Sequence, residues 1–181
     1  MRALSPAVAT LRAAGAFVAD AALINAAAPD PLNLGEGEPS SGNYGITWTD
    51  FDGDGDFDLY ISKCRLGTSD VRDPRRINKL LRNDGDTDGD GKINYTESGP
   101  AAGLAIGEQS WISDFADTDN DGDMDVWVGN HSGNCTLYRN NGDATFTDLG
   151  VASGLQMASS LIQPLEAAFR DFNNDGWVDF I

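Results

Sequence analysis

One pattern, D-x-[DN]-x-D-G-x-x-D, occurs three times in this 181-residue chain, beginning at Asp50, Asp117 and Asp171. Each copy has oxygen-bearing side chains at positions 1, 3, 5 and 9, and a glycine at position 6 that gives the backbone the freedom for a sharp turn. Alternate residues of a tight loop can point inward together, and hard cations such as Ca²⁺ bind six to eight oxygen ligands. The pattern therefore predicts three loops that bind a hard cation.

The sequence on both sides of each copy indicates β-strands. An aromatic residue lies two positions before each first aspartate, and an apolar or β-branched run follows each last aspartate, as in Leu59-Tyr60-Ile61. We therefore predict that each loop joins two strands. The first aspartates are 67 and 54 residues apart, and Asn141-Gly142 marks a hairpin within the second repeat. A repeat of this length with several strands per unit predicts propeller blades or a stacked β-array.

These loops and hairpins resemble the FG-GAP/VCBS repeats of integrin-alpha-like β-propellers, and the resemblance covers residues 43–181. It implies an all-β fold of β-propeller-type repeat blades, a partial propeller of about two to three blades. It also implies that the loops bind Ca²⁺ on one rim of the propeller, and that the module serves extracellular adhesion or recognition.

The resemblance further implies a ligand set, made of the side chains at positions 1, 3, 5 and 9 and the backbone carbonyl at position 7. The implied ligands are Asp50, Asp52, Asp54, Asp56 and Asp58 in the first loop, Asp117, Asp119, Asp121, Asp123 and Asp125 in the second, and Asp171, Asn173, Asp175, Trp177 and Asp179 in the third. Asn173 departs from the all-aspartate form, so the third loop carries one negative charge fewer and is expected to bind more weakly.

A fourth acidic segment, residues 86–97, fits the twelve-residue EF-hand loop. Its candidate ligands are Asp86, Asp88, Asp90, Lys92 at position 7 and Glu97 at position 12. Alignment of the repeats places Glu97 within a hairpin, and Gly99-Pro100 would end any exiting helix early. We therefore interpret the segment as a fourth calcium loop added to a hairpin. An EF-hand sensor is an alternative hypothesis, and it would gain helix on adding calcium.

The charge of the chain excludes some partners. Twelve Lys and Arg residues stand against 29 Asp and Glu residues, a formal net charge of −17, and 17 of the acidic residues lie in the four segments. Such a surface repels phosphate backbones and anionic lipids, so we expect no nucleic-acid partner. No apolar run is long enough to span a bilayer, so we expect no membrane insertion. His131 is the only histidine, which makes a zinc hydrolase or a Ser-His-Asp triad hard to build.

Two features of the repeats leave alternatives open. Cys64 and Cys135 follow equivalent strands of neighbouring repeats, and either a disulfide between adjacent blades or two free thiols is consistent with that placement. A basic cluster either contacts an anionic partner or balances the acidic rim, and we favour the second interpretation. The cluster consists of Arg72, Arg75, Arg76, Lys79 and Arg82.

Residues 1–42 differ in composition from residues 43–181, so we treat them as a separate N-terminal segment and linker. The segment is Ala-rich, and Ser5-Pro6 is typical of a helix start. Phe17 to Ala28 has an alternative interpretation as the end of a preceding blade. Because a closed propeller takes four to eight blades, we expect the chain to be a fragment whose partners include the remaining blades of a longer protein.

These observations lead to one main functional hypothesis. We expect a non-catalytic, calcium-stabilised module of an extracellular or periplasmic protein that recognises an unknown protein or glycan ligand. Free calcium is plentiful only outside the cytosol, which agrees with that location. The alternative is a portion of a propeller enzyme, a lyase or hydrolase, whose active site lies in missing blades.

Overall fold

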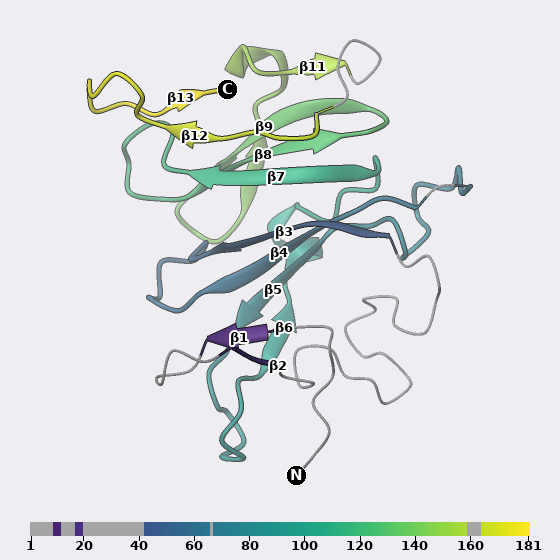
Figure 1. The fold of residues 1–181 in the computed structure, drawn as a ribbon, viewed down its shortest axis with the longest axis vertical. Coiled ribbons are helices and arrows are strands. Elements are labelled where there is room, and N and C mark those ends of the chain that lie inside the picture. Colours follow the sequence, from purple (N-terminus) through teal and green to yellow (C-terminus); the bar gives the residue numbers. More distant parts are fainter. Residues whose placement is uncertain (1–8, 12–16, 20–41, 66, 159–163) are drawn as a thin grey trace.

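The computed structural model describes residues 9–11, 17–19, 42–65, 67–158 and 164–181, and these form antiparallel sheets with almost no helix (Figure 1). In the first sheet each strand pairs with its neighbour in sequence, in the order β3-β4-β5-β6. Its strands are β3 (Asn43–Thr49), β4 (Asp58–Lys63), β5 (Lys79–Asn83) and β6 (Tyr95–Glu97), and the short helix α1 (Gly99–Ala102) follows.

The second sheet repeats this order as β7-β8-β9-β10, and β11 pairs with the first two residues of β9. Its strands are β7 (Ser110–Ala116), β8 (Asp125–Asn130), β9 (Asn134–Asn140), β10 (Phe146–Asp148) and β11 (Met157–Ala158), with the 3-10 turn η1 (Gly150–Ser153) before β11. A third unit begins with the antiparallel pair β12 (Phe169–Arg170) and β13 (Asp179–Phe180). Antiparallel meanders repeated in this way confirm the predicted all-β repeat blades.

The acidic loops occupy equivalent places in the three units. Each D-x-[DN]-x-D-G-x-x-D segment joins the first strand of its unit to the second, as predicted from the flanking residues. The register also repeats, because the pairing of β3 with β4 shifts between Asn43 and Gly45, and that of β7 with β8 shifts between Ser110 and Ile112. The first and second sheets are therefore two copies of one structural unit.

The core lies between successive sheets. One cluster fills the space between the first two sheets, and it includes Phe51, Tyr60, Leu80, Leu104, Val126 and Val128. Gly45 allows a close approach there, because a Cβ atom at this position would lie 2.8 Å from the carbonyl oxygen of Trp111. The first strands also bond across the gap, since Thr47 Oγ1 donates to the carbonyl of Ser113 at 2.9 Å.

Strand β8 shows why one unit needs neighbours on both sides. Val126 and Val128 pack toward the first sheet, whereas Trp127, on the opposite face of the same strand, packs against the third unit with Phe169 and Phe180. All six residues of β8 are buried. A sheet with two apolar faces gains stability only when further units stack against it.

The two cysteines and the N-terminal segment are the remaining features for which the sequence left alternatives open. Cys64 and Cys135 are both buried, and they are two free thiols and not a disulfide between adjacent blades. Within the Ala-rich segment the structure describes only the strand pair β1 (Ala9–Leu11) and β2 (Phe17–Ala19). The helix start at Ser5-Pro6 and residues 20–28 lie outside the described residues. In the part of the chain that is described, no helix has the length and apolar character needed to cross a membrane.

Candidate metal centres

The three repeated loops are closed by the same hydrogen bond. The carboxylate at position 1 accepts from the backbone amide of the glycine at position 6, at 3.1 Å in the first loop, 3.0 Å in the second and 2.9 Å in the third. At Gly122 this geometry requires a φ of 98°, which favours glycine because it has no Cβ atom. This bond from the glycine amide thus holds each loop curled around its position-1 carboxylate.

A second repeated hydrogen bond fixes the residue at position 7. Its backbone amide donates to the carboxylate at position 5, at 2.9 Å in all three loops and in the segment 86–97. The residues held in this way are Asp56, Asp123, Trp177 and Lys92.

In the first two units, the carboxylate at position 9 anchors the loop to the third strand of its sheet. Asp58 Oδ2 accepts from the amide of Phe51 at 3.1 Å, and its Oδ1 accepts from the amide of Asn83 at 2.8 Å. Asp125 repeats this arrangement, with its Oδ1 accepting from the amide of Asn140 at 2.8 Å. Both aspartates are fully buried. Position 9 therefore has a structural task in addition to the ligand role implied by the sequence.

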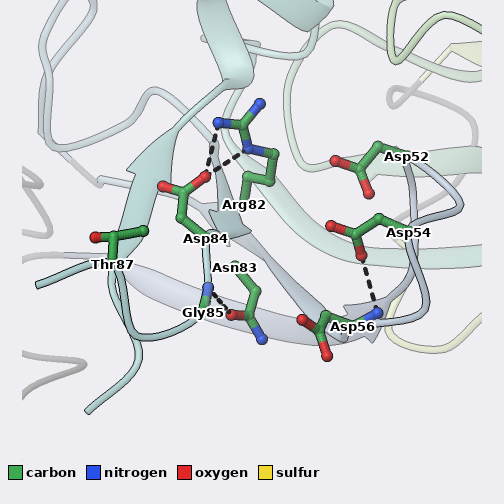
Figure 2. Close-up of a pocket in the computed structure, with 8 residues that line it drawn as sticks. All are labelled: Asp52, Asp54, Asp56, Arg82, Asn83, Asp84, Gly85 and Thr87. Atoms are coloured by element: carbon green, nitrogen blue, oxygen red, sulfur yellow. Dashed lines mark hydrogen bonds and ion pairs between the residues drawn. The ribbon is translucent and has the colours of Figure 1, made fainter. Parts of the chain in front are cut away.

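An open, polar pocket of about 470 Å³ lies between the first loop and the hairpin that follows β5 (Figure 2). Asp52, Asp54 and Asp56 form one side of it, and Arg82 reaches in from the other while pairing with Asp84 at 2.7 Å. A small ion and its waters can reach the first loop through this pocket.

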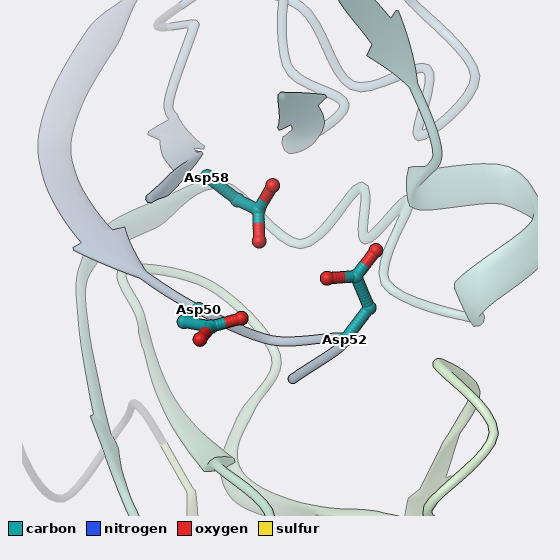
Figure 3. A group of neighbouring side chains, drawn as sticks. All are labelled: Asp50, Asp52 and Asp58. Carbon is teal, nitrogen blue, oxygen red and sulfur yellow. The ribbon is translucent and has the colours of Figure 1, made fainter. Parts of the chain in front are cut away.

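Three carboxylates of the first loop converge on one space. One oxygen each from Asp50, Asp52 and Asp58 lie within 4.8 Å of one another, and Figure 3 shows the side chains facing a common centre. Asp50 Oδ1 and Asp52 Oδ1 are buried and have no hydrogen-bond partner. Burial, and then the nearby Asp54, raise the pKa of Asp52, and burial raises the pKa of Asp58 to about 6. Buried carboxylate oxygens without partners fit a bound cation, which would compensate for their lost solvation.

The second loop gathers a different set, from positions 1, 3 and 5, and two of its three residues, Asp119 and Asp121, are exposed. Oxygens of Asp117, Asp119 and Asp121 lie within 4.8 Å of one another. The pKa of Asp119 is raised by burial and by the charge of Asp121. The last aspartate of the second loop, Asp125, lies outside this group, and its Oδ2 accepts from the backbone amide and the hydroxyl of Thr118.

The EF-hand-like segment brings together only part of its predicted ligands. Asp86, Asp88 and Asp90 converge within 4.8 Å but are exposed, and Lys92 Nζ bonds to the Asp90 carboxylate and lowers its pKa. Glu97 does not join them, because its place on β6 turns it toward Lys79, with which it pairs at 2.6 Å. The entering helix of an EF-hand is replaced by strand β5, so the segment is a loop within a hairpin, as the repeat alignment predicted.

The third loop differs from the first two. Among the described residues, Asp171, Asp175 and Asp179 do not form a convergent carboxylate group. Asn173 Nδ2 donates to Asp175 Oδ2 at 3.0 Å, and the amide of Gly176 lowers the pKa of Asp171. The bonds to Asp171 and Asp175 from the backbone recur in the first two loops, so the neutral Asn173 is what distinguishes the third, and its weaker binding stays a prediction.

Four of the five residues of the basic cluster bond within the chain through their side chains. Arg75 pairs with Asp73 at 2.6 Å, Lys79 with Glu97 and Arg82 with Asp84. Arg76 is buried, and its guanidinium donates to the backbone carbonyls of Gly107 and Thr68. These contacts favour charge balance within the chain over an anionic partner.

Two residues important to the loops were missed by sequence reasoning. Asn83 and Asn140 end the third strands, and each has an amide bonded to the position-9 carboxylate and a side-chain oxygen that accepts from a glycine two residues later. The signal that was available is the repeated Arg-Asn pair at 82–83 and 139–140, followed in both cases by a glycine two positions on.

Stacked antiparallel sheets with an acidic loop after each first strand define a β-propeller-like repeat module. Residues 117–181, which span the second loop and the third unit, match the family model of the FG-GAP-like repeat. This part of the chain is thus similar to an FG-GAP-like repeat, as the loop motifs indicated. No curated protein matches the sequence.

Proposed function

We propose that this module is non-catalytic and binds Ca²⁺ in its acidic loops, and that the bound ions stabilise its fold. The observation that carries the proposal is the first loop, where Asp50 and Asp52 each have a buried oxygen without a partner, and one oxygen each of Asp50, Asp52 and Asp58 lie within 4.8 Å of one another. The residues that would hold the ion there are Asp50, Asp52 and Asp58. The second loop would use Asp117, Asp119 and Asp121.

Calcium fits these loops better than magnesium does. Ca²⁺ accepts six to eight oxygens in flexible geometry, whereas Mg²⁺ needs a tighter octahedron and keeps its waters. Like-charged carboxylates held this close repel one another, and a divalent cation removes that repulsion. Because the unfolded chain has no preformed site, the binding free energy contributes to folding.

The biological role that fits best is adhesion or recognition outside the cytosol. The FG-GAP-like repeat supports that role, and the concentration of free calcium outside cells is high enough to fill sites of modest affinity. We propose a protein or glycan as the ligand and an extracellular or periplasmic location. The proposal assigns no catalytic step to the described residues, whose only histidine, His131, stacks on Trp111 with ring centroids 4.4 Å apart.

Calorimetric titration with Ca²⁺ and with Mg²⁺ tests the metal assignment. We expect the chain to bind at least two Ca²⁺ ions, and Asp52→Ala and Asp119→Ala each to remove one of them. Glu166→Ala is the matched control, because Glu166 is an exposed acid outside the loops, and it should leave the stoichiometry unchanged. Calcium binding no stronger than magnesium binding, or equal stoichiometry in all four proteins, would contradict the proposal.

The pH dependence of binding gives an independent prediction. Asp58 has a pKa of about 6 in the folded chain and 3.8 ordinarily, so the metal-free fold holds its proton more tightly than the unfolded chain does. That contribution to stability is fully present below pH 3.8 and is lost as the pH rises through about 6. Calcium must displace the proton, so the affinity of the first loop should fall as the pH falls through the same value.

We expect the first loop to bind calcium about tenfold more weakly at pH 5 than at pH 7.5. The measurement is a titration of the Asp119→Ala chain, in which the second loop is disabled. Equal affinity at the two pH values would mean that Asp58 titrates near 3.8 or does not bind the ion.

A further inference from the structure

One buried residue links the first two acidic loops. Asn140, the last residue of β9, is 2% exposed, and its side-chain amide donates to the carbonyl of Phe51 at 2.8 Å. Phe51 is the second residue of the first loop and lies between Asp50 and Asp52 in the sequence. This hydrogen bond joins residues 89 positions apart and crosses from the second sheet to the first.

The same asparagine also holds the second loop. Its backbone amide donates to Asp125 Oδ1 at 2.8 Å, and its side-chain amide reaches the carbonyl of Met124 at 3.3 Å. On the other side, the amide of Phe51 donates to Asp58 Oδ2 at 3.1 Å. The carboxylates at position 9 of the two loops are thus connected through only two residues, Phe51 and Asn140.

We infer that Asn140 couples the two loops, so that an ion bound in one raises the calcium affinity of the other. This inference rests on the calcium binding proposed above. An ion in the first loop fixes the peptide of Phe51 between two ligands, and this fixes the partner of the Asn140 amide. The second loop then loses less conformational freedom when its own ion binds, which gives positive coupling. Asn140 is a positioning residue in this account, because it is not itself a ligand.

The first sheet contains a matched control. Asn83 stands in the equivalent place, with its backbone amide bonded to Asp58 Oδ1, its side-chain amide to the carbonyl of Phe57 at 3.3 Å and its side-chain oxygen to the amide of Gly85. All these contacts lie within the first unit. Asn83→Ser therefore removes the same kind of local bond as Asn140→Ser without touching a second loop.

The coupling is measured by titrating calcium into chains with one loop disabled. In the wild-type background we expect the affinity of the second loop to fall about fivefold or more when Asp52→Ala disables the first. Thermodynamic reciprocity requires the same factor for the first loop when Asp119→Ala disables the second. With Asn140→Ser the factor should drop to about one, and with Asn83→Ser it should persist.

The possible failures are distinguishable. Chains that bind no calcium would refute the proposed function and the coupling with it. Two loops that bind calcium with a factor of one in the wild-type background would leave the proposed function intact and refute the coupling. A factor that survives Asn140→Ser would refute the role of Asn140.

A second measurement avoids any substitution at Asn140. In the Asp119→Ala chain, calcium binds the first loop without occupying the second, and hydrogen exchange should slow in residues 117–125 as well as in 50–58. Slowing confined to residues 50–58 would overturn the inference.

Discussion

Calcium at one hundred times its dissociation constant is expected to raise the melting temperature of the metal-free chain by on the order of 10 °C. Each filled loop would stabilise the folded state by about 2.7 kcal/mol at that concentration, and each of the first two repeated loops carries a convergent carboxylate group. The stabilisation arises because the ion binds the folded loop and not the unfolded chain.

Thermal unfolding followed by circular dichroism in chelator, in Mg²⁺ and in Ca²⁺ checks this expectation. We expect a small shift with Mg²⁺ and little change in helix content with either ion, because the acidic segments are loops between strands. Equal shifts for the two ions would contradict calcium selectivity. A large gain of helix would favour the EF-hand sensor instead.

Trp127→Ala is expected to destabilise the metal-free chain by about 3–5 kcal/mol. Trp127 is 1% exposed, its ring lies 4.8 Å from that of Phe180, and its indole nitrogen donates to the carbonyl of Leu155 at 3.3 Å. Removing the indole leaves a cavity between the second sheet and the third unit. Urea unfolding in the presence of chelator measures the change.

Trp177→Ala is the control for this substitution. Trp177 is 55% exposed, so its loss should change the free energy of unfolding by less than about 0.5 kcal/mol. Similar losses in the two variants would mean that the packing of the third unit against β8 contributes little to stability.

Local patterns predicted most of the fold. The apolar runs after each loop became β4, β8 and β13, and Asn141-Gly142 became the turn between β9 and β10. Such predictions succeed because strand alternation and turn chemistry depend on neighbouring residues. The spacing of aspartates predicted a carboxylate group in each of the first two loops but not its membership, because Asp54 lies outside the group of the first loop and Asp125 outside that of the second.

Contacts between distant residues were beyond such patterns. Glu97 matched an EF-hand ligand in spacing, yet the pairing of β6 with β5 places it beside Lys79. The bond from Asn140 to Phe51 depends on how the second sheet stacks on the first, which no local motif encodes. The difference between the third loop and the others was foreseen only through the neutral amide of Asn173.

The most direct test of the account is a diffraction measurement on crystals grown with calcium, using the anomalous signal of the ion. The account predicts an anomalous peak among Asp50, Asp52 and Asp58, with oxygen atoms at about 2.3–2.6 Å. It predicts a second peak among Asp117, Asp119 and Asp121. Loops whose carboxylates turn outward to solvent, with no anomalous peak at either centre at saturating calcium, would contradict the claim that a divalent cation holds these side chains together.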